Sequence, residues 1–153
     1  MSESALKPNQ KKAMATSLLS VLSDTFAVYS KTHLFHWNVT GPQFSSLHEL
    51  FESQYTELWK AIDEIAERVR ALDMMVPPDY ISAQRSAALN GKASPAAAPD
   101  MLRHLIAAQG ALRRTLQTAM GQADEQGDEA SKDLLIERLR EADKSIWMLR
   151  SSL

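Results

Sequence analysis

Hydrophobic side chains recur at helical spacing near the start of the chain, which predicts a long amphipathic helix from about Lys11 to Val39. This stretch contains neither glycine nor proline. Its inward positions follow one another three or four residues apart: Leu18, Leu22, Thr25, Tyr29 and Thr32. We expect the helix to end near Gly41-Pro42, because proline cannot continue the hydrogen-bond ladder and restricts the residue before it.

The helical pattern returns three more times along the chain. A second helix is predicted from Leu47 to about Leu72, with Ser45 or Ser46 positioned to cap its first turn. A third helix is predicted from about Asp100 to Ala123. A break that contains a glycine follows, and a fourth helix is predicted from about Glu129 to Leu149.

The segment between the second and third predicted helices is long. It runs from Asp79 to Pro99 and contains the turn signal Asn90-Gly91, so we expect a crossover with one short helix. Four long helices with one long crossover are typical of a ferritin-like four-helix bundle, and the fold class is predicted to be all-α. We expect a single domain over residues 1–153, with 1–10 as a short flexible tail.

The composition narrows the possible chemistry. The chain has no cysteine, so any metal site must use histidine and carboxylate ligands. No apolar run approaches the ~18 to 20 residues of a membrane span and the N-terminus lacks a signal-peptide pattern, so we expect a cytoplasmic protein with no membrane partner. A net charge of -2 argues against a dedicated nucleic-acid binder, because such proteins neutralise phosphates with Lys and Arg.

Three of the four histidines fall within sixteen residues, where the first predicted helix ends and the second begins. His36 lies five whole turns after Leu18, so it is predicted to face the interior of the bundle. His33 lies to the side of that stripe, and we do not expect it to bind a metal directly. His104 stands alone on a helix and is interpreted as structural or exposed.

The second predicted helix carries four potential metal ligands on one side: His48, Glu52, Asp63 and Glu67. At 100° per residue they fall within an arc of roughly 100°, beside the apolar stripe rather than opposite it. Carboxylates near a core are costly unless they are paired or bind a metal. Each of the two pairs, His48 with Glu52 and Asp63 with Glu67, has members four residues apart, so both members of a pair can reach one ion.

These two pairs cannot meet within one chain. Fifteen residues separate His48 from Asp63, which is roughly 22 Å along a helix axis, whereas ligands of one ion lie a few ångströms apart. Either the residues are unrelated, or a second chain completes the site. A two-fold axis near residues 57–58 would place His48 and Glu52 of one copy against Asp63 and Glu67 of the other, giving two identical sites.

Three segments of the chain resemble the Dps family, the mini-ferritins also called DNA-binding proteins from starved cells. The segments are KTHLFHWNVTGPQFSSLHELFE (Lys31 to Glu52), DEIAER (Asp63 to Arg68) and DLLIERLREADKSIWMLRSSL (Asp133 to Leu153). The resemblance implies a dodecameric cage that oxidises Fe(II) with hydrogen peroxide or oxygen at two-fold interfaces, stores the Fe(III) mineral and protects against oxidative damage. It also implies iron as the metal and the following ligands: His36, His48, Glu52, Asp63 and Glu67.

Two further groups of residues have candidate roles. Trp37 and Trp59 are predicted to lie near the interface, where they pack or donate electrons to an oxidant. Three acids surround the break before the last predicted helix: Asp124, Glu129 and Asp133. They either cap that helix or, as the resemblance implies, line a pore through which Fe(II) enters.

Two alternatives to a ferroxidase remain at this point. One is a nucleoid-associated protein that binds and protects DNA, with iron oxidation secondary; only Lys7, Lys11 and Lys12 favour it. The other is a structural helical oligomer with degenerate sites, which the competent side chains at all five ligand positions disfavour.

Overall fold

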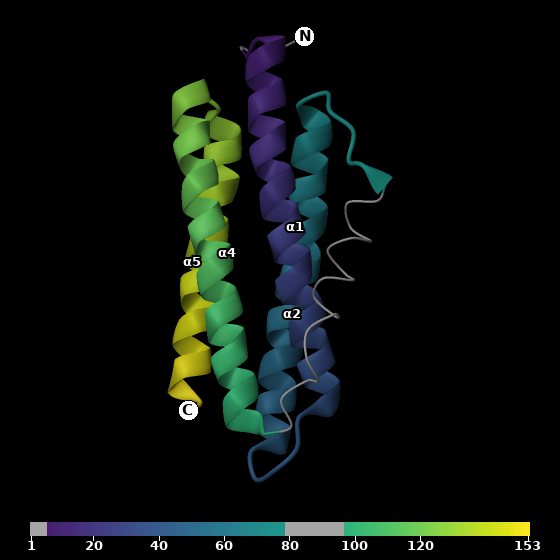
Figure 1. The fold of residues 1–153 in the computed structure, drawn as a ribbon, viewed down its shortest axis with the longest axis vertical. Coiled ribbons are helices and arrows are strands. Elements are labelled where there is room, and N and C mark those ends of the chain that lie inside the picture. Colours follow the sequence, from purple (N-terminus) through teal and green to yellow (C-terminus); the bar gives the residue numbers. More distant parts are fainter. Residues whose placement is uncertain (1–5, 79–96) are drawn as a thin grey trace.

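Four long helices form the body of the molecule in the computed structural model, which describes residues 6–78 and 97–153 (Figure 1). They are α1 (Pro8–Asn38), α2 (Phe44–Ala71), α4 (Ala98–Gln126) and α5 (Glu129–Ser151). The described residues contain no strand, so the prediction of an all-α four-helix bundle is confirmed. The short helix expected in the crossover lies outside the described residues.

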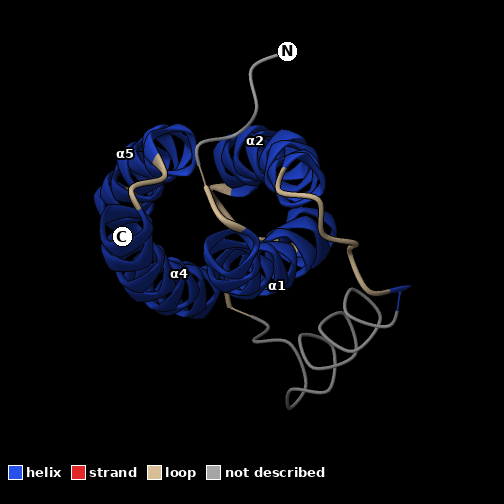
Figure 2. Ribbon diagram, turned by 90° about the horizontal axis from the view of Figure 1, so that it is seen from above, coloured by secondary structure: helices blue, strands red, loops and turns tan. Residues whose placement is uncertain are grey.

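The helices occupy the four corners of a bundle when it is seen along its length (Figure 2). α1 packs against both α2 and α4, and α5 packs against α4. Contact between α2 and α5 is sparser. None of the helices in the described ranges has a segment long and apolar enough to cross a membrane.

Two helix starts differ from the sequence prediction. α1 begins at Pro8 rather than Lys11, because proline is well suited to the first turn and the Lys7 backbone N–H donates to Gln10 Oε1 at 2.8 Å. Residues 8–10 of the expected flexible tail are therefore helical. α2 begins at Phe44 and neither predicted serine caps it, since Ser46 Oγ instead donates to the carbonyl oxygen of Gln43 at 3.0 Å.

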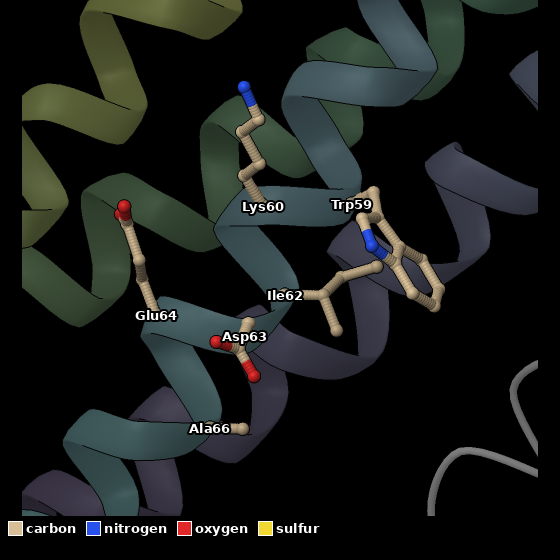
Figure 3. A pocket seen from close by; sticks show the side chains of 6 residues that line it. All are labelled: Trp59, Lys60, Ile62, Asp63, Glu64 and Ala66. Atoms are coloured by element: carbon tan, nitrogen blue, oxygen red, sulfur yellow. The ribbon is translucent and has the colours of Figure 1, made fainter.

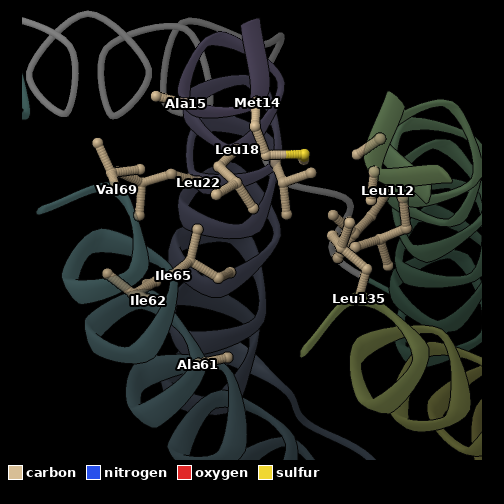
Figure 4. Packing of buried hydrophobic residues seen from close by; sticks show 14 of the residues in the cluster. Met14, Ala15, Leu18, Leu22, Ala61, Ile62, Ile65, Val69, Leu112 and Leu135 are labelled. Carbon is tan, nitrogen blue, oxygen red and sulfur yellow. The ribbon is translucent and has the colours of Figure 1, made fainter. Parts of the chain in front are cut away.

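Two hydrophobic clusters fill the interior. The larger one joins all four helices and includes Leu18 and Leu22 of α1, Ile65 of α2 and Leu135 of α5 (Figure 4). The smaller one lies around Phe35, where α1 ends, and includes Phe51, Met101 and Leu149. Burial of these side chains supplies the main driving force for packing and sets the rotation of each helix about its axis. The face of α2 that remains exposed carries three of the candidate ligands: Glu52, Asp63 and Glu67.

An ion pair between buried Arg138 and half-buried Glu57 joins α5 to α2. Arg138 is 4% exposed and makes a two-pronged contact with the carboxylate of Glu57, with Nη2 3.0 Å from Oε2. The second hydrogen bond runs from Arg138 Nη1 to Glu57 Oε1. A bidentate ion pair of this kind fixes the axial offset between α2 and α5 more precisely than apolar packing does, because both hydrogen bonds form only when the guanidinium and the carboxylate lie side by side.

The turn between α4 and α5 is organised by Asp128, which is 4% exposed. Gly127 adopts a left-handed conformation with φ 69° that ends α4. Asp128 then caps α5 by accepting from the backbone N–H of Ser131 at 3.1 Å. Its carboxylate also pairs with Arg68 Nη2 of α2 at 2.9 Å, which ties this turn to the end of α2.

Candidate metal centre

His36 and His48 come together where α1 ends and α2 begins. The connection reverses the chain through Gly41, whose φ of 107° is unfavourable for residues with a side chain. The two imidazole rings stack in parallel, with centroids 3.8 Å apart and an angle of 13° between their planes. His36 is buried, as its position on the inward stripe predicted, and His48 is half-buried.

Each histidine is held by the backbone of the other. His36 Nδ1 lies 2.8 Å from the carbonyl oxygen of His48, and His48 Nδ1 lies 2.8 Å from the carbonyl oxygen of His36. A carbonyl oxygen can only accept a hydrogen bond, so both Nδ1 atoms must carry the hydrogen. When the rings are neutral, Nε2 of each therefore keeps its lone pair. This arrangement orients both rings as metal ligands, and helical spacing alone could not reveal it.

The three candidate carboxylates lie outside the apolar core. Glu52, Asp63 and Glu67 are all exposed in the single chain, which corrects the expectation that they are pressed toward the interior. These carboxylates are exposed because α2 is rotated so that Leu58, Ile62 and other apolar side chains occupy its buried face. Because these carboxylates are solvated in the single chain, their burial does not require a metal ion to neutralise them. Their candidacy as metal ligands therefore rests on their positions along α2.

An open groove of about 510 Å³ runs beside Asp63 on α2. Figure 3 shows Trp59, Ile62, Asp63 and Ala66 along one side of the helix. Nearby, Trp37 is 62% exposed and Trp59 is 58% exposed. A surface that presents two large aromatic side chains beside carboxylates is typical of a protein interface rather than of a free surface.

The five predicted ligands do not converge within one chain. His36 and His48 meet at one end of α2, whereas Asp63 and Glu67 follow more than three turns later on the same straight helix. In the described part of the chain no three His, Asp or Glu side chains are grouped closely enough to hold a metal ion. The site shared between two subunits stays a prediction.

His33 lies between two aromatic rings beside the stacked histidines. Its centroid is 4.0 Å from those of both Tyr55 and Trp37, and Tyr29 Oη lies 3.1 Å from its Nδ1. Burial lowers the pKa of His33, and the nearby positive charge of protonated His36 lowers it further. Sequence reasoning placed His33 beside the inward stripe but could not identify these partners.

The three acids proposed for an entry pore are exposed around the α4–α5 turn. Asp124 Oδ1 pairs with Lys132 Nζ at 2.6 Å, and this hydrogen bond raises the pKa of Lys132. None of the three is the helix cap, because Asp128 fills that role. Capping itself is therefore wrong for these three acids. Glu129 nevertheless lies in the first turn of α5, where its charge favours the helix dipole, and the pore role stays a prediction.

Known proteins resemble this chain over nearly its whole length. A family model described as a ferritin-like domain matches residues 16–153. The DNA protection during starvation protein of Brevibacillus brevis is 32% identical over 148 residues, covering 97% of this chain and 99% of that protein. The DNA protection during starvation protein 2 of Bacillus anthracis is 34% identical over 132 residues, covering 86% of this chain and 90% of that protein.

A solved structure supports the same assignment. The Dps protein of Vibrio cholerae O1, described as a member of the ferritin-like diiron-carboxylate superfamily, superimposes with a TM-score of 0.87 at 28% identity. The match covers 99% of this chain and 96% of that one. Fold and sequence similarity together show that this chain belongs to the Dps family of the ferritin-like superfamily.

Proposed function

We propose that this protein is a ferroxidase and iron store that oxidises Fe(II) at sites shared between two subunits and holds the Fe(III) mineral inside a dodecameric cage. The observation that carries this proposal is the reciprocal locking of His36 and His48, which leaves both Nε2 atoms as ready ligands. Family membership supports iron as the metal, since ferritin-like diiron-carboxylate proteins are among the relatives.

The residues present fit Fe(II) as a substrate. Imidazole and carboxylate together suit iron, zinc or manganese, and the absence of cysteine removes the ligands that softer metals prefer. His36, His48 and Glu52 of one subunit would bind the ion from one side. Asp63 and Glu67 of the partner subunit would bind it from the other side and balance its charge. Positions left open would admit hydrogen peroxide or oxygen.

The exposed surface of α2 supports a two-fold partner. Trp59 and Ile62 line the groove beside Asp63, and an apolar surface of this kind gains free energy when a second copy covers it. An isologous contact across the middle of α2 would bring each histidine pair to the partner's acid pair. The same contact would exclude water from the bound ion, which strengthens its interaction with the carboxylates.

The direct test is oxidation of Fe(II) by the assembled protein with hydrogen peroxide and, separately, with oxygen. We expect ultraviolet absorbance of Fe(III) to rise faster than in buffer alone, and the iron to elute with a particle about twelve times the mass of the chain. Oxidation at the rate of buffer alone, with both oxidants and with the assembly intact, would refute a ferroxidase.

A separate prediction concerns the entry of iron. Replacing Asp124, Glu129 and Asp133 by Asn, Gln and Asn should slow Fe(II) uptake about tenfold at low ionic strength, because fewer negative charges attract the cation. The measurement is the initial rate of uptake by stopped flow as salt is varied. Asp100→Asn, a change to an exposed acid near the start of α4, is the matched control. Equal rates for the pore variant and the wild type at low salt would exclude this entry route.

DNA binding is the second candidate function, and the structure weakens it. Lys11 Nζ pairs with Asp73 Oδ2 at 2.6 Å, so one of the three N-terminal lysines is already partly neutralised. This hydrogen bond and charge lower the pKa of Asp73. The chain also carries 19 acidic against 17 basic side chains, which repel phosphates overall.

We therefore predict weak or absent DNA binding at ~0.15 M salt, with stronger binding at low salt or below about pH 6, where histidines gain charge. A gel-shift titration measures this. Replacing Lys7, Lys11 and Lys12 by Gln should remove the low-salt binding while iron oxidation is spared. Tight binding that does not respond to salt would make DNA a principal partner.

A further inference from the structure

A layer of polar residues lies inside the bundle, between the two hydrophobic clusters. Each helix contributes one residue to this polar layer: Thr32 of α1, Gln54 of α2, Gln109 of α4 and Ser145 of α5. Along each helix, the smaller cluster lies about one turn to one side of this residue and the larger cluster about one turn to the other. In α4, for example, Leu105 belongs to the smaller cluster and Leu112 to the larger, and Gln109 stands between them.

Three members of the polar layer are buried as deeply as the apolar core. Thr32 is 1% exposed, Gln54 is 5% exposed and Gln109 is 1% exposed. Glutamine is mostly found on protein surfaces, because burying its amide costs free energy unless each polar atom finds a partner. Two buried glutamines at one level of a four-helix bundle therefore require a complete set of hydrogen bonds.

The described part of the chain does not supply that set. Gln54 Oε1 and Gln109 Oε1 are both buried, and neither accepts a hydrogen bond from any described residue. Gln54 Nε2 donates to the carbonyl oxygen of Ser145 at 3.4 Å, and rotating the amide to exchange its two ends would turn its oxygen toward that carbonyl, which cannot donate. Thr32 Oγ1 already donates to the carbonyl oxygen of Val28 at 2.7 Å. The two amide oxygens therefore need a donor from outside the chain.

Water fits the polar layer better than an ion does. All four of its side chains are neutral, so a cation held among them would keep an uncompensated charge in the interior. One water molecule offers two O–H donors, which is what the two amide oxygens lack, and its own oxygen can accept from an amide N–H. Thr32 and Ser145 are also smaller than Phe35 and Leu149, which stand about one turn away in the smaller cluster, so the polar layer has more room than that cluster.

We propose that the polar layer is a buried water-binding site, in which ordered water donates hydrogen bonds to Gln54 Oε1 and Gln109 Oε1. The water joins α2 to α4, which lie diagonally across the bundle (Figure 2). The proposal does not depend on the ferroxidase function, because it concerns the interior of one subunit and none of the candidate metal ligands.

Bound water in this position would select the axial register of the helices. If α4 slid by one turn against α2, Gln109 would enter one of the apolar clusters, where neither water nor the chain can pair its amide. A single polar residue in an apolar core is known to specify register in this way, at some cost in stability. The polar layer would therefore keep the four helices at the offset that the rest of the core requires.

The first test is a crystal structure of the assembled protein at a resolution that shows ordered water. We expect one water, or a chain of two, within hydrogen-bond distance of Gln54 Oε1 and Gln109 Oε1. Gln109→Met, which keeps the length of the side chain but removes its amide, should eliminate this density. Gln117→Met, a change at an exposed position of the same helix, is the matched control and should leave the density in place.

The second test counts water in solution. Oxygen-17 magnetic relaxation dispersion detects water molecules that stay inside a protein, and Gln109→Met and Gln54→Met should each lose about one long-lived water per subunit relative to the wild type. Equal counts in the wild type and both variants would overturn the proposal. So would wild-type density in which protein atoms pair both amides with no ordered water between the clusters. Rubidium bound at this level in crystals soaked in rubidium chloride would show a cation site and overturn the assignment to water.

Discussion

Mixing two inactive variants should restore about a quarter of the iron-oxidising sites. The first variant carries His36→Ala and His48→Ala, and the second carries Asp63→Ala and Glu67→Ala. In an equal, random mixture a site is intact only when the histidines come from the second variant and the acids from the first, which happens in about one site in four. Each variant alone should lose nearly all activity, because removal of ligands weakens metal binding by well over tenfold.

The subunits must be mixed in a dissociated state and then reassembled, with mass spectrometry to verify hybrid dimers. The initial rate of Fe(III) formation, normalised to the wild type, is the readout. Combining the two variants as intact assemblies, without exchange of subunits, is the control and should give no recovery. Verified hybrids that remain inactive would show that the histidines and the acids do not share a site.

Glu57→Gln should destabilise the bundle more than the loss of an exposed ion pair does. Arg138 is 4% exposed and would keep its charge without the carboxylate that now neutralises it. The Glu57 side chain is 33% exposed, so solvent offsets part of this loss. We expect a cost of about 2 kcal/mol, which for a chain of this length corresponds to about 4 to 8 °C in Tm. Thermal unfolding followed by circular dichroism measures the change.

Two further variants test whether the loss of stability comes from leaving the charge of Arg138 unpaired. Asp143→Asn breaks the exposed pair between Asp143 Oδ1 and Arg113 Nε at 2.6 Å, and it should change Tm little, because water screens such pairs. The double change Glu57→Leu, Arg138→Met should recover most of the lost stability, since apolar residues of similar size leave no buried charge. Equal Tm values for Glu57→Gln and Asp143→Asn would mean that burial of the pair contributes nothing.

Sequence reasoning predicted where the helices lie and the start of α5 at Glu129, but it missed the starts of α1 and α2. The apolar pattern of α1 identified its inward stripe, including His36, because helical period is a local property of the chain. Its start at Pro8 was missed because the first turn is stabilised by a proline and by the contact of Lys7 with Gln10, not by the periodic apolar residues. The cap of α5 by Asp128 was missed for a similar reason, since several acids stand nearby in the sequence.

The candidate ligands were accessible to sequence reasoning because they stand at regular spacing on straight elements. A rise of 1.5 Å per residue was enough to show that His48 and Asp63 lie too far apart along the helix to share one ion within a chain. The exposure of Glu52, Asp63 and Glu67 was predicted wrongly, since an arc measured on a helical wheel does not tell how wide the buried face of α2 is. That width depends on how closely the neighbouring helices approach.

Local patterns in the sequence were sufficient for the fold class, for the chemical types of the ligands and for the spacing that rules out a site within one chain. The contacts between helices became visible only in the folded chain: the His36 and His48 carbonyl contacts, the ion pair of Arg138 with Glu57, and the hydrogen bond between Tyr29 and His33. The two kinds of information differ in how far apart along the chain the interacting residues lie. Helical period is set by neighbours within one turn, whereas contacts between helices depend on the turn at Gly41 and on the axial offset that core packing selects.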